Sequence, residues 1–253
     1  MFLTSKKAVG STGRLFFLIL SLWLSAAAPA SAQRLFHVDA ETKVLHNGTS
    51  RVVEKQLYYT RGGNLNILWK IGAVSYYSAT TAFGFTDFYY PAANQAMSMD
   101  SNMFKASDEL LYLFAEGGME DMGLSREGFV LKTSKKDGDY TVRRYEPKKR
   151  GGLCAWVEVA YDQQFRPVYC AYFNKKGRII TKTYLSHYQE EKGFAFPMRV
   201  TEISYNLAEK NDSTIRLDVY KNLELDIQRE AHLFRVPSNA EKVDLKEGLK
   251  SVL

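Results

Sequence analysis

Apolar and polar residues alternate one by one along much of this 253-residue chain. Near its C-terminal end, for example, Ile215, Leu217 and Val219 alternate with Arg216 and Asp218. Successive side chains of a β-strand point to opposite faces, so a period of two is typical of a strand with one buried face. The pattern therefore predicts a mainly antiparallel β protein whose sheet has an apolar face and a polar face.

The same alternation divides the chain into strands separated by turns rich in Gly, Asn and Asp. Asn47-Gly48, between two alternating runs, is a strong hairpin signal and predicts a hairpin over residues 35–61. Further strands are expected at 64–71, around 76–77 and 85–90, and at 124–132, 153–161, 168–174, 178–188, 196–205 and 213–225.

Between residues 101 and 122 the period changes from two to the spacing of a helix. Phe104, Leu110, Leu111 and Phe114 recur at helical intervals, and Gly117-Gly118 follows as a helix-ending pair. One or two short helices are therefore expected here. The complete pattern is that of an α+β protein, mainly β with short helices.

The first residues have the three parts of a secretory signal peptide. Lys6, Lys7 and Arg14 supply positive charge, residues 15–20 and 22–24 are apolar, and Ala30-Ser31-Ala32 has the form of a cleavage site. An uncleaved anchor is the alternative, but a spanning helix needs roughly 20 apolar residues. We expect residues 1–32 to be removed and residues 33–253 to fold as a single periplasmic domain.

The formal net charge of +6 suggests nucleic acid at first sight, but export removes that partner. The basic residues are dispersed, apart from the short cluster Lys148-Lys149-Arg150. A solvated loop is the favoured interpretation of this cluster. Attraction to anionic lipid head groups is the alternative.

Cys154 and Cys170 lie in neighbouring predicted strands of an exported chain, so a disulfide is one reading. A symmetric turn between the strands would place Cys154 about four positions out of register with Cys170. Two buried free thiols are the other reading, and the spacing leaves both open.

Motifs for hydrolytic, metal or phosphate chemistry are lacking: the sequence has no G-x-S-x-G, H-E-x-x-H, C-x-x-C or glycine-rich phosphate loop. His37, His46, His187 and His232 are scattered and read as ordinary surface histidines. We therefore expect no catalytic residues, no metal and no cofactor, and a chain that is not an enzyme.

Several short motifs occur in an order that resembles the LolA-like family, the periplasmic carriers that take lipoproteins toward the outer membrane. They span nearly all of residues 33–253, and their order matters more than any one of them. The matching stretches are Phe36 to Ile71 with Trp69, Phe88-Tyr89-Tyr90-Pro91 followed by Asn94-Gln95, Tyr145-Glu146-Pro147, the strand from Val157 through Asp162, Pro167, Gly177, Asn222 to Asp226, and Leu233-Phe234-Arg235-Val236-Pro237.

This resemblance implies a curved, incomplete antiparallel β-barrel of roughly 10 to 11 strands, with a helical lid on its concave face. The chain departs from the family in two places. The long N-terminal amphipathic helix of the family is missing or much reduced in this chain. Leu68 stands where the best-known carriers have an arginine beside the Trp69 position.

The chain is rich in aromatic residues, with 16 Tyr and 15 Phe, and a curved sheet with two short helices has little to cover its concave face. Some apolar surface is then left for a ligand. We expect acyl chains of lipoproteins, or phospholipid, to contact nine residues: Leu65, Ile67, Trp69, Leu110, Leu111, Phe114, Ile215, Leu217 and Val219.

The function predicted from these features is a monomeric periplasmic carrier that receives lipid from an inner-membrane donor complex and delivers it to an outer-membrane acceptor. A lipid-sensing or interaction module of the cell envelope, using the same fold, is the first alternative. An envelope protein whose aromatic interior is simply full is the second.

Overall fold

The computed structural model describes residues 35–60, 63–81, 85–99, 110–115, 117–149, 151–208 and 212–243. The predicted signal peptide and Phe104 lie outside these residues.

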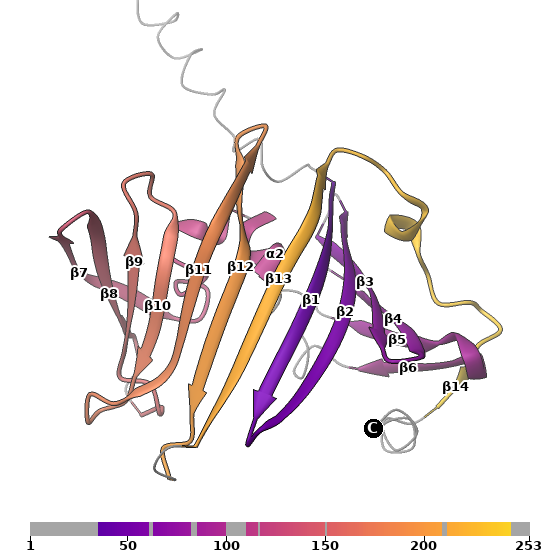
Figure 1. The fold of residues 1–253 in the computed structure, drawn as a ribbon, viewed down its shortest axis with the longest axis horizontal. Coiled ribbons are helices and arrows are strands. Elements are labelled where there is room, and N and C mark those ends of the chain that lie inside the picture. The colour runs from indigo at the N-terminus through magenta and orange to yellow at the C-terminus, as the bar shows by residue number, and fades with distance from the viewer. Residues whose placement is uncertain are drawn as a thin grey trace, which may run out of the picture. The chain divides into compact units, whose positions relative to one another are not determined.

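Within these residues, fourteen strands form one sheet that does not close into a barrel (Figure 1). The N-terminal group of strands is β1 (Phe36–His46), β2 (Thr49–Thr60), β3 (Asn64–Ile71), β4 (Val74–Thr80), β5 (Thr86–Tyr90) and β6 (Gln95–Met99). The second group is β7 (Phe129–Asp137), β8 (Tyr140–Pro147), β9 (Trp156–Tyr161), β10 (Pro167–Phe173), β11 (Ile179–Glu191), β12 (Phe194–Tyr205) and β13 (Ser213–Leu225), and β14 (Glu241–Lys242) is last.

Each group is an antiparallel meander, and the two groups meet where β1 pairs with β13. Across the sheet the order is β14-β6-β5-β4-β3-β2-β1-β13-β12-β11-β10-β9-β8-β7, so β14 and β7 are the two edge strands. Among the strands of the described residues, only β14 pairs in parallel, with β6. The predicted mainly antiparallel fold with short helices is confirmed.

Two-residue turns set the register of the long hairpins. Asn47 and Gly48 have φ angles of 47° and 76°, which lets His46 pair directly with Thr49 across the β1–β2 turn. Asparagine and glycine adopt such left-handed angles most readily, so this pair closes a tight hairpin. The hairpin predicted over residues 35–61 is confirmed.

The number of strands exceeds the expected 10 to 11. Short strands and polar strands show little alternation of apolar and polar residues, so the sequence pattern does not identify them. Residues 124–132, predicted as a strand, begin with turns, and β7 starts only at Phe129. From Leu131 to Asp137 the β7 side chains are all exposed, so β7 has no apolar face to reveal it. Strand β14 has only two residues.

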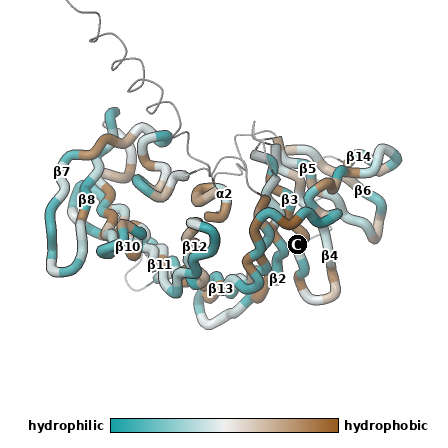
Figure 2. The backbone as a smooth tube through the Cα atoms, turned by 90° about the horizontal axis from the view of Figure 1, so that it is seen from above, coloured by the Kyte–Doolittle hydropathy of each residue, from teal (hydrophilic) through white to brown (hydrophobic). Residues whose placement is uncertain are grey.

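The sheet bends around helix α2 (Leu110–Ala115), as a view along the strands shows (Figure 2). We call the face that packs against α2 the inner face; it carries Val38 and Leu57. Gly117, with φ of 74°, follows the helix, and the 3-10 turn η4 (Gly118–Glu120) comes next. The short helices predicted between residues 101 and 122 are thus confirmed for the described part of that segment.

The opposite, outer face is covered at β2 and β3 by the chain that follows β13. This segment contains the 3-10 helix η5 (Glu230–Leu233). The buried Asn66 side chain donates hydrogen bonds to the carbonyl oxygens of Ala231 and His232, each at 3.0 Å. Phe234 stacks on Tyr77 with ring centroids 4.4 Å apart.

Replacing Asn66 with alanine should lower the free energy of unfolding by about 1–3 kcal/mol, because the carbonyl groups that it satisfies lose their buried donor. Urea denaturation of the purified protein measures this. Asn66→Asp should cost at least as much, since a carboxylate cannot donate to a carbonyl. Wild-type stability in both variants would show that Asn66 does not hold the C-terminal segment.

Candidate functional site

An apolar cluster fills the inner face between β1, β2, β3, β12 and α2. It forms because the alternating residues of each strand point to the same side and the short helix covers them. Leu111, Phe114 and Ala115 of α2 are fully buried in it. The buried members from the strands are Phe36, Val38, Ala40, Leu57, Tyr59, Leu65, Ile67, Leu185, Phe194, Phe196, Val200, Tyr220, Leu223 and Leu225.

Six of the nine predicted contact residues meet in this cluster. Four of them are buried members and two are partly buried side chains packed against it. The six are Leu65, Ile67, Trp69, Leu110, Leu111 and Phe114. The β3 and α2 residues of the candidate site therefore lie on the same face of the sheet.

The other three, Ile215, Leu217 and Val219, lie on the outer face, which corrects the prediction for β13. Leu217 pairs with Lys43 and Val219 with Glu41, while Asp218 pairs with Thr42. Paired residues share a face of the sheet. Ala40 of β1 belongs to the inner cluster, so Thr42, two residues further along β1, and its partner Asp218 also face inward. The sequence predicts that the apolar residues of β13 face inward, whereas the register turns Arg216 and Asp218 inward instead.

A buried polar group therefore stands on the inner face of β13. Asp218 is only 4% exposed and accepts a hydrogen bond from Thr42. The guanidinium of Arg216 lies 2.9 Å from the same carboxylate. A buried carboxyl group needs such partners, and Thr42 and Arg216 supply them to Asp218.

Beside α2 the inner face is hollowed by about 320 Å³. This volume is at the lower end of the roughly 300–1,000 Å³ typical of ligand pockets. The side formed by α2 is apolar, whereas the side formed by the sheet is mainly polar and has Val200 beside Asp218. The apolar lining includes Leu110, Leu113, Met122 and Val200, and the polar lining includes Glu127, Thr181, Thr183, Glu202, Arg216 and Asp218.

Two further groups of the hollow, the Cys170 thiol and the Tyr172 phenol, are held neutral. Burial raises the pKa of Cys170 to about 12, and Glu127 adds to the shift. Burial also raises the pKa of Tyr172. Cys154 and Cys170 are both free, as one of the two readings predicts, but only Cys170 is buried, and Cys154 is half-buried. Neither thiol is a ready nucleophile, because the reactive thiolate is disfavoured.

Trp69 marks the other end of the apolar cluster. Its Nε1 donates a hydrogen bond of 2.8 Å to the Ser78 hydroxyl, and its ring stacks on Tyr76 with centroids 5.7 Å apart. The Lys55 ammonium lies 4.5 Å from the centre of the ring. Leu68 directly precedes Trp69 in β3, so it points to the outer face, away from α2.

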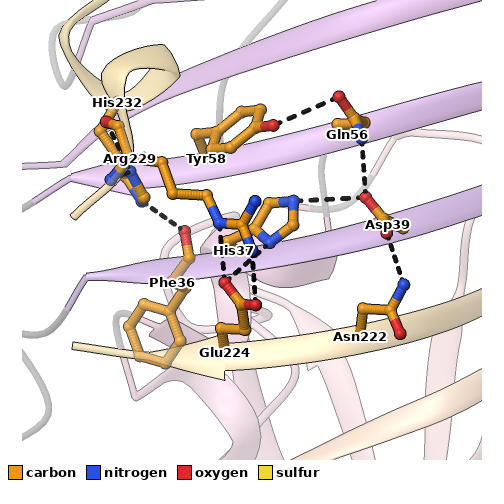
Figure 3. Close-up of polar contacts among 9 residues, drawn as sticks. All are labelled: Phe36, His37, Asp39, Gln56, Tyr58, Asn222, Glu224, Arg229 and His232. Atoms are coloured by element: carbon orange, nitrogen blue, oxygen red, sulfur yellow. Dashed lines mark hydrogen bonds and ion pairs between the residues drawn. The ribbon is translucent and has the colours of Figure 1, made fainter. Parts of the chain in front are cut away.

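Two of the four histidines are buried, which corrects the expectation that all four lie on the surface. His37 and His232 are each 3% exposed, on the outer face (Figure 3). His232 Nε2 lies 3.0 Å from the Phe36 carbonyl oxygen. The His37 ring stacks on Tyr58, with centroids 4.6 Å apart. Sequence reasoning missed them because both are buried where the C-terminal segment, which contains His232, packs against β1 and β2, strands that are remote in the chain.

Carboxylates flank His37 on both sides. Its ring nitrogens lie 3.2 Å from an Asp39 oxygen and 3.3 Å from a Glu224 oxygen. Arg229 binds Glu224 through two nitrogens, at 2.6 and 2.8 Å, and lowers the pKa of that carboxyl. Burial nevertheless outweighs the carboxylates and lowers the pKa of His37. The cluster is thus built around a neutral imidazole.

Among the described residues, no group of three or more His, Cys, Asp or Glu side chains is arranged to hold a metal ion. Within the same residues, no helix has the length and apolarity required to cross a membrane.

Known structures share this fold at low sequence identity. A LolA superfamily protein from Nitrosomonas europaea superposes with a TM-score of 0.55 and 12% identity, over 80% of this chain and 91% of that one. A DUF1329 family protein from Desulfovibrio piger gives 0.54 and 13%, over 87% and 95%. A Vibrio parahaemolyticus domain named for outer membrane lipoprotein sorting gives 0.50 and 10%, over 79% and 89%.

No protein-family model matches the sequence, and no curated protein has a significant sequence match to it. The backbone nevertheless has a LolA-like fold, as the sequence motifs predicted. The class of protein is therefore defined by its architecture: an open, bent antiparallel sheet with a short helix on its inner face.

Protonation of His37 should destabilise the protein at mildly acid pH. Because the folded-state pKa lies below the ordinary value of 6.5, the unfolded chain binds the proton more readily than the folded one. The free energy of unfolding should then fall as the pH drops from about 7 to about 5. His37→Gln should flatten this dependence in urea denaturation measured across that range.

The matched control is His187→Asn, at an exposed histidine whose left-handed backbone suits asparagine. It should keep the slope of the wild-type protein. Equal slopes in wild type and His37→Gln would show that His37 does not couple stability to pH.

Proposed function

We propose that this chain is a periplasmic carrier that binds acyl chains of lipoproteins, or phospholipid, on its inner face and moves them toward the outer membrane. The observation that carries the proposal is the continuity of the apolar cluster with the hollow beside α2, since Leu110 belongs to both. The LolA-like fold supports it. Leu65, Ile67, Trp69, Leu111 and Phe114 would supply the rest of the acyl contact.

Hydrocarbon burial provides the binding energy. Each buried CH₂ group contributes about 0.8 kcal/mol, so a chain of ~16 carbons would gain on the order of 12 kcal/mol if fully covered. A carrier must also release its cargo, so only part of this energy can be used. An interior that is partly filled by its own side chains meets this condition.

Helix α2 is the element that would make room for an acyl chain. It has six residues, three of them buried against the sheet. The segment that follows is tied to the sheet through the carbonyl oxygen of Glu120, which accepts hydrogen bonds of 2.7 Å from Tyr161 and 3.1 Å from Arg143. A ligand would displace the α2 side chains while this tie holds the connection in place.

The polar wall of the hollow would receive the less apolar part of the cargo. Side chains such as Arg216, Asp218 and Glu202 are costly to bury under alkane. A polar group of the cargo should therefore lie against them. An ester, amide or head group at the end of the acyl chain meets this need.

The partners that follow are an inner-membrane donor complex and an outer-membrane acceptor, with the carrier acting as a monomer. Nucleic acid, a cofactor and catalysis have no part in this mechanism. The export that it requires depends on the predicted signal peptide at residues 1–32.

Native mass spectrometry of protein isolated from the periplasm tests the proposal, together with uptake of a fluorescent fatty-acid probe. Leu110→Glu should weaken probe binding by about tenfold or more, because it puts a charge at the junction of cluster and hollow. Leu217→Glu is the matched control on the outer face and should bind as wild type.

Equal losses in the two variants, or no bound lipid and no uptake in the wild type, would reject the inner face as a lipid site. Lipid that binds but never passes to acceptor membranes would replace the carrier by the sensing module. Circular dichroism of both variants serves as the control that the sheet is retained.

A further inference from the structure

Four exposed lysines gather at one end of the sheet, on two connections that lie side by side (Figure 1). Lys148 and Lys149 follow β8, and Lys175 and Lys176 form the turn between β10 and β11. The two connections touch where the Ala155 amide donates a 2.7 Å hydrogen bond to a carbonyl at the end of β10. The basic cluster of the sequence is thus joined by a second pair of lysines.

An apolar side chain projects from the same place. Leu153 is 82% exposed, the highest value among the exposed large hydrophobic residues of the described chain. Two glycines precede it, and a Cβ atom at either Gly151 or Gly152 would meet nothing within 4 Å. The loop tip therefore stands clear of the rest of the protein.

Between the two connections lies a hollow of about 360 Å³ with a cationic and aromatic lining. Arg144 lies over the Trp156 ring, 4.5 Å from its centroid, and Trp156 stacks on Phe173 at 5.0 Å. Glu146 pairs with Arg144 at 3.1 Å. The Nε of Arg144 and the Nε1 of Trp156 are buried and make no hydrogen bond.

We propose that this end of the protein, Lys148, Lys149, Leu153, Lys175 and Lys176 with the adjoining hollow, docks on the surface of an anionic lipid bilayer. The lysines would meet lipid phosphates, Leu153 would enter the acyl boundary, and the hollow would admit a head group. The proposal goes beyond the carrying of lipid on the inner face, which uses other residues.

A bilayer fits the combination better than an acidic protein does. Lysines near an anionic membrane strengthen binding about fivefold each, and a single apolar side chain set among them reaches hydrocarbon just below the phosphates. An acidic protein surface would pair with the lysines but has no apolar layer at that depth. Tryptophan is also enriched at membrane interfaces, and Trp156 adjoins the loop.

Co-sedimentation with vesicles of phosphatidylglycerol mixed with phosphatidylcholine tests the proposal, using protein isolated from the periplasm. The wild type should bind these vesicles and not vesicles of phosphatidylcholine alone. Lys148→Gln with Lys149→Gln should weaken binding by about tenfold or more. Leu153→Ser should weaken it by about tenfold.

Each variant has a matched control. Lys135 and Lys136 are also exposed but lie at the other end of the β7–β8 hairpin. The control variant Lys135→Gln with Lys136→Gln changes the net charge by the same amount, away from the proposed site. At ~0.1 M salt, charges more than about 10 Å away are largely screened, so its loss should stay below about twofold. Ile227→Ser, at a residue 53% exposed, should bind like the wild type.

Absence of binding to anionic vesicles overturns the proposal, as do equal losses in the two lysine pairs or wild-type binding by Leu153→Ser. Retention on immobilised polyglutamate without vesicle binding would also overturn it, in favour of a protein partner. Uptake of the fatty-acid probe should be unchanged in all of these variants, so failure here is distinguishable from failure of the carrier proposal.

Discussion

The pairing of β1 with β13 determines what the two faces of this protein carry. It joins the N-terminal meander to the C-terminal one at the centre of the sheet. By pairing Thr42 with Asp218 and Ala40 with Tyr220, it places a buried carboxyl group and an aromatic ring on the inner face. A shift by one residue would exchange the faces and bring Ile215, Leu217 and Val219 inward. The polar wall of the hollow therefore depends on this one register.

Much of the fold could be predicted because it depends on patterns of residues that are close together in the sequence. Asn47-Gly48 set a hairpin, alternating residues set the strands, and Gly117 marked the end of the helix. Strand β7 could not be predicted in full, since an edge strand with exposed lysines has no apolar alternation. Lysines on an edge prevent pairing with other chains, so the feature that hides this strand from pattern analysis also protects it.

The candidate site was only half predictable for a related reason. Alternation along β3 and the helical spacing of α2 each identify an apolar set, and in both the apolar set faces the core. Strand β13 has an apolar set too, but its opposite set includes Asp218, whose partners Thr42 and Arg216 make burial tolerable. Such compensation comes from a strand far away in the chain, so no local pattern contains it. The buried histidines His37 and His232 escaped prediction in the same way.

The two proposed sites make opposite demands on exposed apolar surface. On the inner face the apolar residues are covered by α2, and a polar wall beside them suits a ligand with one apolar and one polar part. At the lysine end, a single leucine is left uncovered among four cations. An uncovered apolar residue costs solubility, and the surrounding charges offset that cost in water while attracting an anionic surface. A protein that exchanges lipid with membranes needs both arrangements, one to shelter the cargo and one to approach the bilayer.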